Sequence, residues 1–575
     1  MTTSQYLAAA VQFEPTMGDT EGNVSRLLEL TADAATRGAD LVVLPEMATT
    51  GYCWSSREEI APFVETIPGP TIERFCALAA ERQVWIVVGM PEVDGETGAY
   101  YNSAALVGPE GVRGTYRKTH AFITEVRWAT DGDLGLPVFE TPLGRLGILI
   151  CMDAEYPETA RVLALQGCDV VCFPTNWLGE HSPSPFWMQR AYENGAFWVA
   201  ANRYGLERGV QFSGGSAVIG PDGRIRDLVD SGDGIAMAAV DLSLARQERA
   251  DRLRRRRPDH YRDVSLNSYL WPSVHTRAPN DGGALDALGA PSEPTAVTLV
   301  AVPPWLSDVS ILERTSEDLL KLHPALVVLP PLAAPSIEAE LTDAAAKSGR
   351  MLDQLQDLAR HHDTLIVTSA PLLEEGCVFD AVVLLRPDGG RVVHRNTHPR
   401  GGRSWARPGG SVPPVERTPV GLVGLLAADE LLPPEPLRGV AARGAEFVAV
   451  SGGLEGPAVV GVPATSIPLP DRSPRSADPE HWILPRVRAA ESNVWLALAA
   501  TGDCPSGIYG PSFYRFPRHE ALARSAAAVL ELRADPSDRD RRTALEKPYL
   551  RMRLPHLYGP LTWNRVTDGD GSLPQ

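Results

Sequence analysis

The sequence predicts an α/β protein built from two tandem copies of one layered domain, and three observations lead to this prediction. Short apolar runs alternate with amphipathic stretches along the first half, a pattern typical of strands that alternate with helices. The chain has 575 residues, too many to surround a single hydrophobic core. Several segments of the first half recur in the same order in the second half, so the sequence contains an internal repeat.

In the first half, the predicted elements follow one another with short connections. Strands are predicted where apolar residues run continuously, and the turn at residues 108–111 joins two of them as a pair. Amphipathic helices are predicted between the strands, and Gly38 is expected to end the first of them. The predicted strands are residues 6–13, 39–46, 84–92, the pair within 100–118, 144–153, 169–176, 197–205 and strands within 214–225. The predicted helices are residues 23–38, 71–83, 157–167 and 186–195.

A linker is predicted at residues 278–294, which are rich in Pro, Gly and Ala and show no apolar periodicity. The order of elements restarts directly after this segment. We therefore predict a first domain at residues 1–277, a second domain at residues 295–540 and a C-terminal extension at residues 541–575. The last residues of that extension are expected to form a frayed tail.

The composition is that of an ordinary globular protein, with 44% apolar and 22% charged residues. A net charge of −18 argues against nucleic acid or an anionic membrane as the main partner, and no apolar run is long enough to span a membrane. The N-terminus does not resemble a secretion signal, and seven widely spaced cysteines favour a reducing cytoplasm over a disulfide framework. The basic run at residues 252–258 is interpreted as a solvated helix face.

Three reactive side chains each stand at the C-terminal end of a predicted strand: Glu46, Lys118 and Cys151. In open α/β sheets this edge is where ligands bind. Taken singly, each residue has an ordinary structural explanation, as a helix cap, a solvated lysine or a core cysteine. Their occurrence together, in this order, indicates a catalytic site.

These three groups can together cleave an unactivated C–N bond. The thiolate of a cysteine is the attacking species, and a carboxylate can take the thiol proton during attack and later activate water. An ammonium favours the thiolate and stabilises the oxyanion of a tetrahedral intermediate, together with a backbone N–H such as that of Met152. Such a reaction passes through a thioester and needs no metal and no cofactor.

The segments around these residues resemble the signature segments of the nitrilase superfamily of carbon–nitrogen hydrolases. They are VVLPE, YRKTH and LICMDAEYPETARVLALQG, followed in the right order by PTNW, AANRYG and FSGGSAVIGPDG. The resemblance covers residues 5 to about 245 and implies a four-layer α-β-β-α sandwich. It also implies that Glu46 is the general base, Lys118 the oxyanion-stabilising lysine and Cys151 the nucleophile. Glu125 matches the family's second glutamate, which positions the substrate and the catalytic lysine.

The resemblance implies that the partner is a small molecule and that the reaction converts a carboxamide to an acid and ammonia, because LICMDAEYPE resembles the amidase branch. Nitrile hydrolysis and N-carbamoyl amide hydrolysis use the same triad and stay open as alternatives. Tyr52, Asn176 and Trp177 lie just beyond strand ends and are predicted to line the pocket for the acyl group. Aromatic residues at these places are equally consistent with the core.

A different function is suggested by the stretch FVAVSGGLEG at residues 447–456. It resembles the start of the phosphate loop of ATP pyrophosphatases, which would make the protein a glutamine-dependent, ATP-using ligase such as an NAD synthetase. The Asp and Ser that complete that loop are replaced by Glu455 and Gly456. In the repeat, Ser451–Leu454 stand where Pro174–Trp177 stand, so we interpret them as the strand-end loop of a second copy.

The second half keeps the framework of the first half without its reactive groups. The repeat sets three catalytic residues against three that cannot replace them: Glu46 against Pro331, Lys118 against Asn396 and Cys151 against Ala428. We therefore predict a degenerate, catalytically silent nitrilase-like domain. Because nitrilase-like domains usually pair, the resemblance implies an intrachain pseudo-dimer of the two copies. Formation of a larger homo-oligomer stays open.

Overall fold

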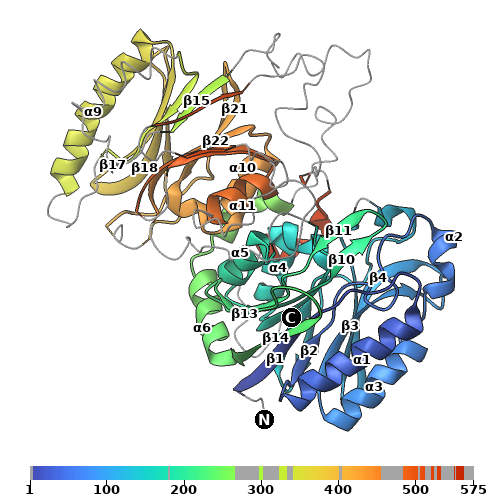
Figure 1. Cartoon of the computed structure of the whole chain (residues 1–575). Coiled ribbons are helices and arrows are strands. Elements are labelled where there is room, and N and C mark those ends of the chain that lie inside the picture. The colour runs from blue at the N-terminus through green and yellow to red at the C-terminus, as the bar shows by residue number, and fades with distance from the viewer. Residues whose placement is uncertain are drawn as a thin grey trace. The chain divides into compact units, whose positions relative to one another are not determined.

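The computed structural model describes residues 4–122, 124–178, 182–265, 297–301, 323–332, 341–400, 405–454, 483–502, 506–511, 520–522, 527–532, 549–550 and 552–562. These residues form two compact units, which divide between Arg254 and Arg255 (Figure 1). The predicted linker at residues 278–294 lies outside the described residues, and the predicted domain limits stay predictions. No helix in the described part of the chain is long and apolar enough to cross a membrane.

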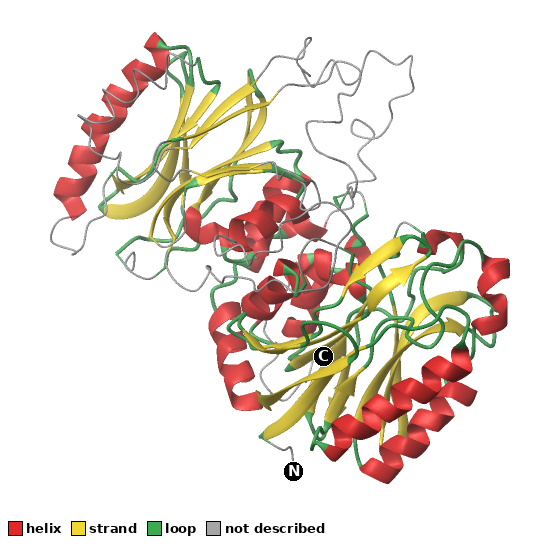
Figure 2. Ribbon diagram, in the orientation of Figure 1, coloured by secondary structure: helices red, strands yellow, loops and turns green. Residues whose placement is uncertain are grey.

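In the first unit, two six-stranded sheets pack face to face between two layers of helices (Figure 2). The order of the first sheet is β14 (Gly234–Asp241), β1 (Gln5–Gln12), β2 (Leu41–Val43), β3 (Trp85–Val93), β4 (Tyr100–Gly108) and β5 (Gly111–Arg117). The order of the second sheet is β13 (Ile225–Leu228), β12 (Ala217–Ile219), β9 (Phe197–Asn202), β8 (Val170–Thr175), β7 (Gly144–Ile148) and β6 (Val138–Thr141). This arrangement is the predicted α-β-β-α sandwich.

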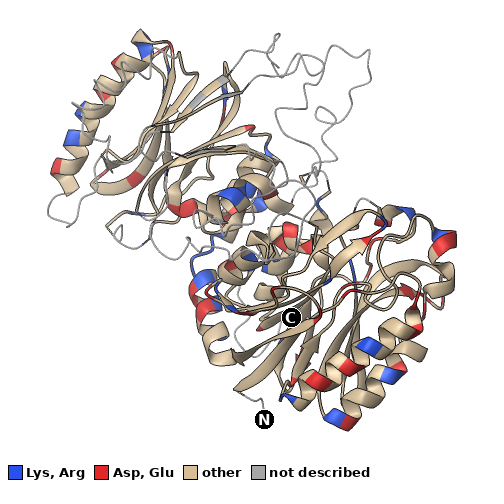
Figure 3. Ribbon diagram, in the orientation of Figure 1, with Lys and Arg blue, Asp and Glu red and all other residues tan. Residues whose placement is uncertain are grey.

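The helices of the first unit cover the outer faces of these sheets. Helices α1 (Thr20–Thr36) and α3 (Pro70–Arg82) lie side by side on the first sheet, and α4 (Pro157–Leu165) and α5 (Pro185–Asn194) pack beside the second. In α1, Val24, Leu27 and Leu30 face the sheet because they recur at helical spacing. The Asp19 carboxylate caps this helix by accepting the N–H of Gly22 at 3.0 Å. Charged residues are more frequent on the outer helices than on the strands (Figure 3).

The second unit repeats this architecture strand for strand. The order of its first sheet is β26 (Ala528–Leu532), β15 (Val297–Ala301), β16 (Leu326–Val328), β17 (Leu365–Glu374), β18 (Cys377–Leu385) and β19 (Arg391–Arg395). The order of its second sheet is β25 (Glu520–Leu522), β24 (Gly507–Tyr509), β23 (Trp495–Gly502), β22 (Phe447–Leu454), β21 (Gly421–Ala427) and β20 (Val415–Thr418). Helix α9 (Leu341–His361) covers the first of these sheets, and α10 (Pro434–Ala442) and α11 (Ile483–Glu491) pack beside the second. The predicted tandem fold is confirmed.

Several predicted strand limits differ from the structure. The strand predicted at residues 39–46 is only β2, and the strand predicted at residues 144–153 ends at Ile148. A 3₁₀ turn, Cys151–Glu155, follows that strand, because the Asp153 carboxylate accepts the N–H of Ile150 at 3.0 Å and bends the chain. The sequence analysis also missed helix α6 (Leu242–Leu253) and the two-stranded ribbon of β10 (Tyr204–Glu207) and β11 (Val210–Ser213).

The stretch Ser451–Leu454 is not a loop, so that prediction is wrong. These residues are the last four of β22, and their backbones pair with Ala499–Gly502 of β23. In the first unit β8 stops at Thr175, one residue before Asn176. In the second unit, β22 therefore continues through the positions that correspond to Asn176 and Trp177, which lie beyond the end of β8 in the first unit.

The described residues also contain a second repeat that the sequence analysis missed. The motif Arg-x-Pro-x-x-Tyr occurs at residues 256–261 and at residues 553–558, and both segments belong to the second unit. In each segment the arginine lies 5.4 Å from the centre of the tyrosine ring, and the tyrosine oxygen accepts a backbone N–H at 3.0 Å. Arg256 donates to the carbonyl of Leu561, and Arg553 donates to the carbonyl of Val264. The two segments thus bind one another reciprocally, as the halves of a two-fold pair do.

The basic run at residues 252–258 is only partly solvated, which corrects its interpretation as an exposed helix face. The Arg254 side chain is 74% exposed, but the Arg256 side chain is 3% exposed and pairs with Glu435 of α10 at 3.3 Å. Because a buried arginine keeps its charge, Arg256 must be matched by such partners.

We predict that Arg256→Ala destabilises the second unit by about 3–5 kcal/mol, because it removes one partner of a buried ion pair. For a unit of this size, that corresponds to a fall in melting temperature of roughly 6–15 °C. Differential scanning calorimetry of the full chain measures the shift. The control Arg254→Ala removes an exposed arginine and should change the stability by less than about 0.5 kcal/mol. Equal shifts for the two variants would contradict the structural role of Arg256.

Candidate active site

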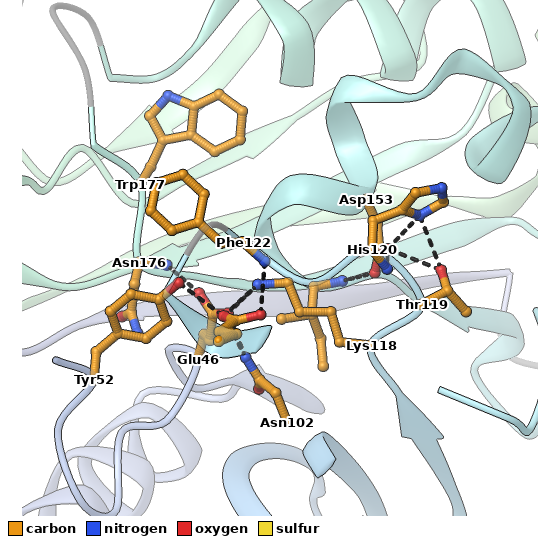
Figure 4. A network of polar contacts seen from close by, with 12 residues as sticks. Glu46, Tyr52, Asn102, Lys118, Thr119, His120, Phe122, Asp153, Asn176 and Trp177 are labelled. Atoms are coloured by element: carbon orange, nitrogen blue, oxygen red, sulfur yellow. Dashed lines mark hydrogen bonds and ion pairs between the residues drawn. The ribbon is translucent and has the colours of Figure 1, made fainter. Parts of the chain in front are cut away.

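Glu46 lies at the centre of a buried polar network beyond the end of β2 (Figure 4). Its Oε1 atom accepts hydrogen bonds from Lys118 Nζ and Asn102 Nδ2, each at 2.7 Å. Its Oε2 atom accepts the backbone N–H of Asn176 at 2.8 Å. The Glu46 side chain is 0% exposed. The carboxylate is therefore fixed by groups from three different strand ends.

Lys118 follows β5 and stands between two carboxylates. Its Nζ atom donates to Oε1 of Glu46 and to Oε1 of Glu125, each at 2.7 Å. Glu125 in turn accepts hydrogen bonds from Tyr52 at 2.7 Å, from Asn102 at 3.0 Å and from the N–H of Phe122 at 2.9 Å. One ammonium thus bridges two carboxylates, and the Asn102 amide contacts both of the same carboxylates.

Cys151 opens the 3₁₀ turn that follows β7, with a backbone φ of 45°. This left-handed conformation is strained for a residue with a side chain, at a cost of about 1–3 kcal/mol. Asp153 holds the turn in place. Besides the N–H of Ile150, it accepts the Tyr116 hydroxyl at 2.7 Å and the Thr119 hydroxyl at 2.9 Å. The nucleophile turn is therefore tied to the segment that carries Lys118.

Burial and mutual charge set the protonation states of the three groups. Burial raises the pKa of Glu46 to about 7, although Lys118 opposes this rise. Burial also raises the pKa of the Cys151 thiol, the charge of Glu46 raises it further, and Lys118 and Thr175 lower it only in part. Burial lowers the pKa of Lys118, but the charges of Glu125 and Glu46 outweigh this and hold it well above its ordinary value. At neutral pH the resting site thus contains a thiol, an ammonium and a carboxylate that is ready to accept a proton.

Some buried polar atoms around the site have no partner among the described residues. They include the side-chain oxygen and nitrogen of Asn176 and the oxygen atom of Asn102 that does not contact the carboxylates. Leaving a buried polar group without a partner costs about 1–3 kcal/mol. Such a group in a native structure calls for an explanation, and a bound polar ligand supplies one.

The other predicted pocket residues surround this network. Figure 4 shows the rings of Tyr52 and Trp177 on the same side of Glu46, together with Phe122. Trp177 also packs against Phe186 and Trp187, with ring centres 6.1 and 5.5 Å apart. It therefore belongs partly to the core.

Met152 is the second residue of the 3₁₀ turn and is fully buried. The first N–H groups of a helical turn have no acceptor within the turn, so its N–H is available to a ligand.

Asn102 is the functional residue that the sequence analysis missed. It is a buried polar residue of β4, as is its neighbour Ser103, in a strand that is otherwise largely apolar, and this departure is a weak signal in the sequence. The structure brings Lys118 into contact with Glu125, and the charge of Glu46 raises the pKa of the Cys151 thiol. Within the described residues, no group of three or more His, Cys, Asp or Glu side chains is arranged to hold a metal ion.

In the second unit, the corresponding positions hold different groups. Pro331 follows β16, Asn396 follows β19 and Ala428 follows β21. The amide of Asn396 donates to Asp380 at 3.0 Å and to Asp429 at 3.3 Å. Unlike Cys151, Ala428 does not adopt a left-handed backbone conformation.

The scaffold behind these positions is nevertheless retained. Glu430 occupies the place of Asp153 and accepts the N–H of Ala427 and the N–H of Thr397, each at 2.9 Å. The network that ties the turn to the lysine segment in the first unit therefore has a counterpart in the second.

The chain is similar to known proteins over both units. The family model described as carbon–nitrogen hydrolase matches residues 7–250 and again residues 307–524. A nitrilase from Pyrococcus abyssi is 38% identical over 259 residues, which are 44% of this chain and 98% of that protein. An (R)-stereoselective amidase from a Pseudomonas species is 35% identical over 259 residues, 44% of this chain and 90% of that protein.

An N-carbamoylputrescine amidase from Solanum lycopersicum is 32% identical over 281 residues, 44% of this chain and 93% of that protein. Each of these relatives is thus about as long as one of the two matched regions. The family model matches well over half of the residues, in two separate regions. The chain therefore belongs to the carbon–nitrogen hydrolase family, also called the nitrilase superfamily.

Proposed function

We propose that this protein hydrolyses a small, uncharged carboxamide to a carboxylic acid and ammonia, through a thioester on Cys151. The observation that carries this proposal is the buried array in which Lys118 bridges Glu46 and Glu125 beside a strained cysteine. Each group has a distinct task in such a reaction. The triad and the second glutamate therefore keep the roles expected from the sequence.

The first half of the reaction forms the thioester. Glu46 takes the proton of the Cys151 thiol while the sulfur attacks the carbonyl carbon of the amide. The resulting oxyanion is stabilised by Lys118 Nζ and the N–H of Met152. Glu46 then returns the proton to the nitrogen of the substrate, the C–N bond breaks, and ammonia leaves.

The second half of the reaction releases the acid. Glu46 again acts as base and takes a proton from water, whose oxygen attacks the thioester carbonyl. The same oxyanion contacts stabilise the second tetrahedral intermediate. Collapse of this intermediate breaks the C–S bond, and the proton on Glu46 passes to the departing sulfur. Lys118 stays protonated throughout, because its pKa is held well above its ordinary value.

Two features favour an amide over a nitrile and over an N-carbamoyl amino acid. Asn176 offers a buried acceptor and a buried donor without partners, and a carboxamide presents both N–H groups and a carbonyl. A nitrile carries no N–H group and leaves the acceptor unmatched. An N-carbamoyl amino acid would bring a third carboxylate to a site whose described ion pairs contain two carboxylates and one cation, Lys118, whereas an N-carbamoyl amine has no carboxylate and is not disfavoured on this ground. Nitriles and ureides are therefore the comparison substrates of the assay.

The second unit supports the proposal that only one copy catalyses. Pro331, Asn396 and Ala428 supply neither a base, nor a positive charge, nor a nucleophile. The segment at residues 399–404, which follows Asn396 as Glu125 follows Lys118, contains no Asp or Glu. Nothing in the described residues favours the ATP-using ligase, because the glycines that suggested it belong to β22. A cytoplasmic location, intrachain pairing of the copies and further oligomerisation stay predictions.

We predict that Cys151→Ala lowers ammonia release from amides by at least about 1,000-fold, because it removes the only nucleophile of the proposed mechanism. A coupled ammonia assay over a panel of short amides, nitriles, ureides and glutamine measures this, with and without ATP. Cys76→Ala, which changes a half-buried cysteine of α3, is the control and should keep full activity. Undiminished turnover by Cys151→Ala would refute the thioester mechanism, and turnover that depends on ATP would favour the ligase.

We predict that the pH profile of kcat/KM has an acid limb with a midpoint near pH 7. Below this midpoint kcat/KM should fall about tenfold per pH unit. Glu46 accepts a proton only when ionised, and its pKa is raised to about 7. The charge of Glu125 raises this pKa and the hydrogen bond from Asn102 lowers it. Glu125→Gln should therefore move the limb to lower pH, and Asn102→Ala should move it to higher pH.

Pre-steady-state and steady-state rates measured between pH 5 and 9 locate this limb for each variant. Both substitutions also slow the reaction, so the direction of the two shifts is the informative result. If both variants shifted the limb in the same direction, the assignment of Glu46 as base would be wrong.

A further inference from the structure

A buried ion pair lies outside the array that carries out the proposed reaction. Arg203 follows β9 and Glu207 ends β10, and their charged groups are 2.6 Å apart. The side chains are 1% and 5% exposed, and the Arg203 guanidinium lies 4.1 Å from the centre of the Phe212 ring. Burying two charges costs several kcal/mol per ion before their attraction offsets it, so a pair in this position calls for a reason.

The carboxylate of Glu207 holds the loop that follows Glu46. Its Oε1 atom accepts the backbone N–H of Tyr52 at 2.8 Å and of Cys53 at 2.6 Å, while Arg203 contacts the other oxygen. Gly51 lets the loop approach this closely, because a side chain there would place a Cβ 2.8 Å from the Glu207 carboxylate. Gly51 also has a φ of +83°, which favours glycine. The loop at residues 51–53 is thus pinned to β10 through one carboxylate.

The same loop delivers a hydrogen bond to the reactive array. The hydroxyl of Tyr52 donates to Oε1 of Glu125 at 2.7 Å, the atom that also contacts Lys118 Nζ. The Tyr52 ring packs edge-on against Phe212, with ring centres 5.9 Å apart. A continuous set of contacts therefore runs from Arg203 through Glu207 and Tyr52 to Glu125.

The second unit forms the same two sheets without this pair. Strands β22 and β23 pair in the same register as β8 and β9, which places Thr501 opposite Arg203 in the repeat. Thirteen residues (204–216) separate Arg203 from β12, but only five (502–506) separate Thr501 from the corresponding strand β24, so the segment that carries Glu207 has no counterpart in the second copy.

Another buried ion pair of the first unit is retained in both copies. Arg190 pairs with Glu193 in α5, and Arg488 pairs with Glu491 in α11 at 2.6 Å. The second copy has thus kept the buried ion pair within this helix, which we interpret as part of the scaffold. It lacks Arg203 and Glu207 together with the three catalytic residues.

We propose that Arg203 and Glu207 are positioning residues for catalysis, which hold the loop at residues 51–53 so that Tyr52 orients Glu125 toward Lys118. This inference rests on the proposed amidase function, in which Glu125 positions the catalytic lysine. Neither residue touches the reacting atoms. Their effect reaches the reaction through the Tyr52 hydroxyl.

The test compares Glu207→Ala, Glu207→Gln and Tyr52→Phe in the full-length chain. Glu207→Ala removes the acceptor of both loop N–H groups, and kcat should fall about 10- to 100-fold. Glu207→Gln keeps one acceptor oxygen and should recover part of this loss. Once Glu125 is displaced, its charge raises the pKa of Glu46 less, so the acid limb of kcat/KM should move to lower pH. Circular dichroism confirms that each variant is folded.

The matched control is Glu193→Gln, which changes the buried ion pair that both copies share. It should lower the melting temperature without moving the acid limb. A double variant, Tyr52→Phe with Glu207→Ala, should lose no more activity than Glu207→Ala alone, because both changes break the same set of contacts. Losses that multiply, or a lower melting temperature with an unchanged acid limb, would overturn the positioning role.

A second readout separates this inference from the proposed function. The rate at which iodoacetamide alkylates Cys151, followed by peptide mass spectrometry, reports on the thiol and its base without any turnover. If the wild-type chain hydrolyses no amide, the proposed function fails. The positioning role then stands if Glu207→Ala and Tyr52→Phe shift the pH profile of alkylation alike, and it falls if that profile is unchanged.

Discussion

The proposed active site depends on one interaction, the Lys118 ammonium held 2.7 Å from each of two buried carboxylates. A single carboxylate buried at this depth would be strongly disfavoured in its charged form, and two would repel each other. The ammonium stabilises the charged form of both carboxylates, because its single positive charge lies next to each of them. It does not offset their charges fully, and the pKa of Glu46 settles near 7. A base that is half-ionised at neutral pH is thus a consequence of placing three charges in one buried place.

A comparison of the two copies distinguishes features that the fold requires, which both copies share, from features that the proposed chemistry requires, which only the first copy has. Strand order and register are the same in both units, and the carboxylate that holds the nucleophile turn is Asp153 in one and Glu430 in the other. The strained backbone is not shared, since Cys151 is left-handed and Ala428 is not. The backbone of this turn is therefore strained only in the copy that holds the proposed nucleophile. The scaffold has been kept because burying two sheets requires no reactive side chain.

The sequence alone predicts the layered fold, the repeat and the four charged or nucleophilic residues, because each of these follows local patterns or sequence motifs. It does not predict Asn102 or Glu207. Asn102 matters through a bond to Glu46, 56 positions away, and Glu207 through a bond to Tyr52, 155 positions away. In each pair, the two residues are brought together only when the sheets form, so no local sequence pattern indicates the contact. The limits of β22 were misread for a related reason, since only its pairing with β23 shows that the glycines extend the strand.

The net charge of the site also affects substrate binding and product release in the proposed reaction. With Glu46 ionised, the array carries two negative charges and one positive charge, so it accepts a neutral amide more readily than an anion. Hydrolysis turns that neutral substrate into a carboxylate beside Glu46 and Glu125. At 4 Å, two like charges repel by about 4 kcal/mol in a medium of intermediate polarity. The charge of Glu125, which adds to the effect of burial in raising the pKa of the proposed base, therefore also helps to expel the product.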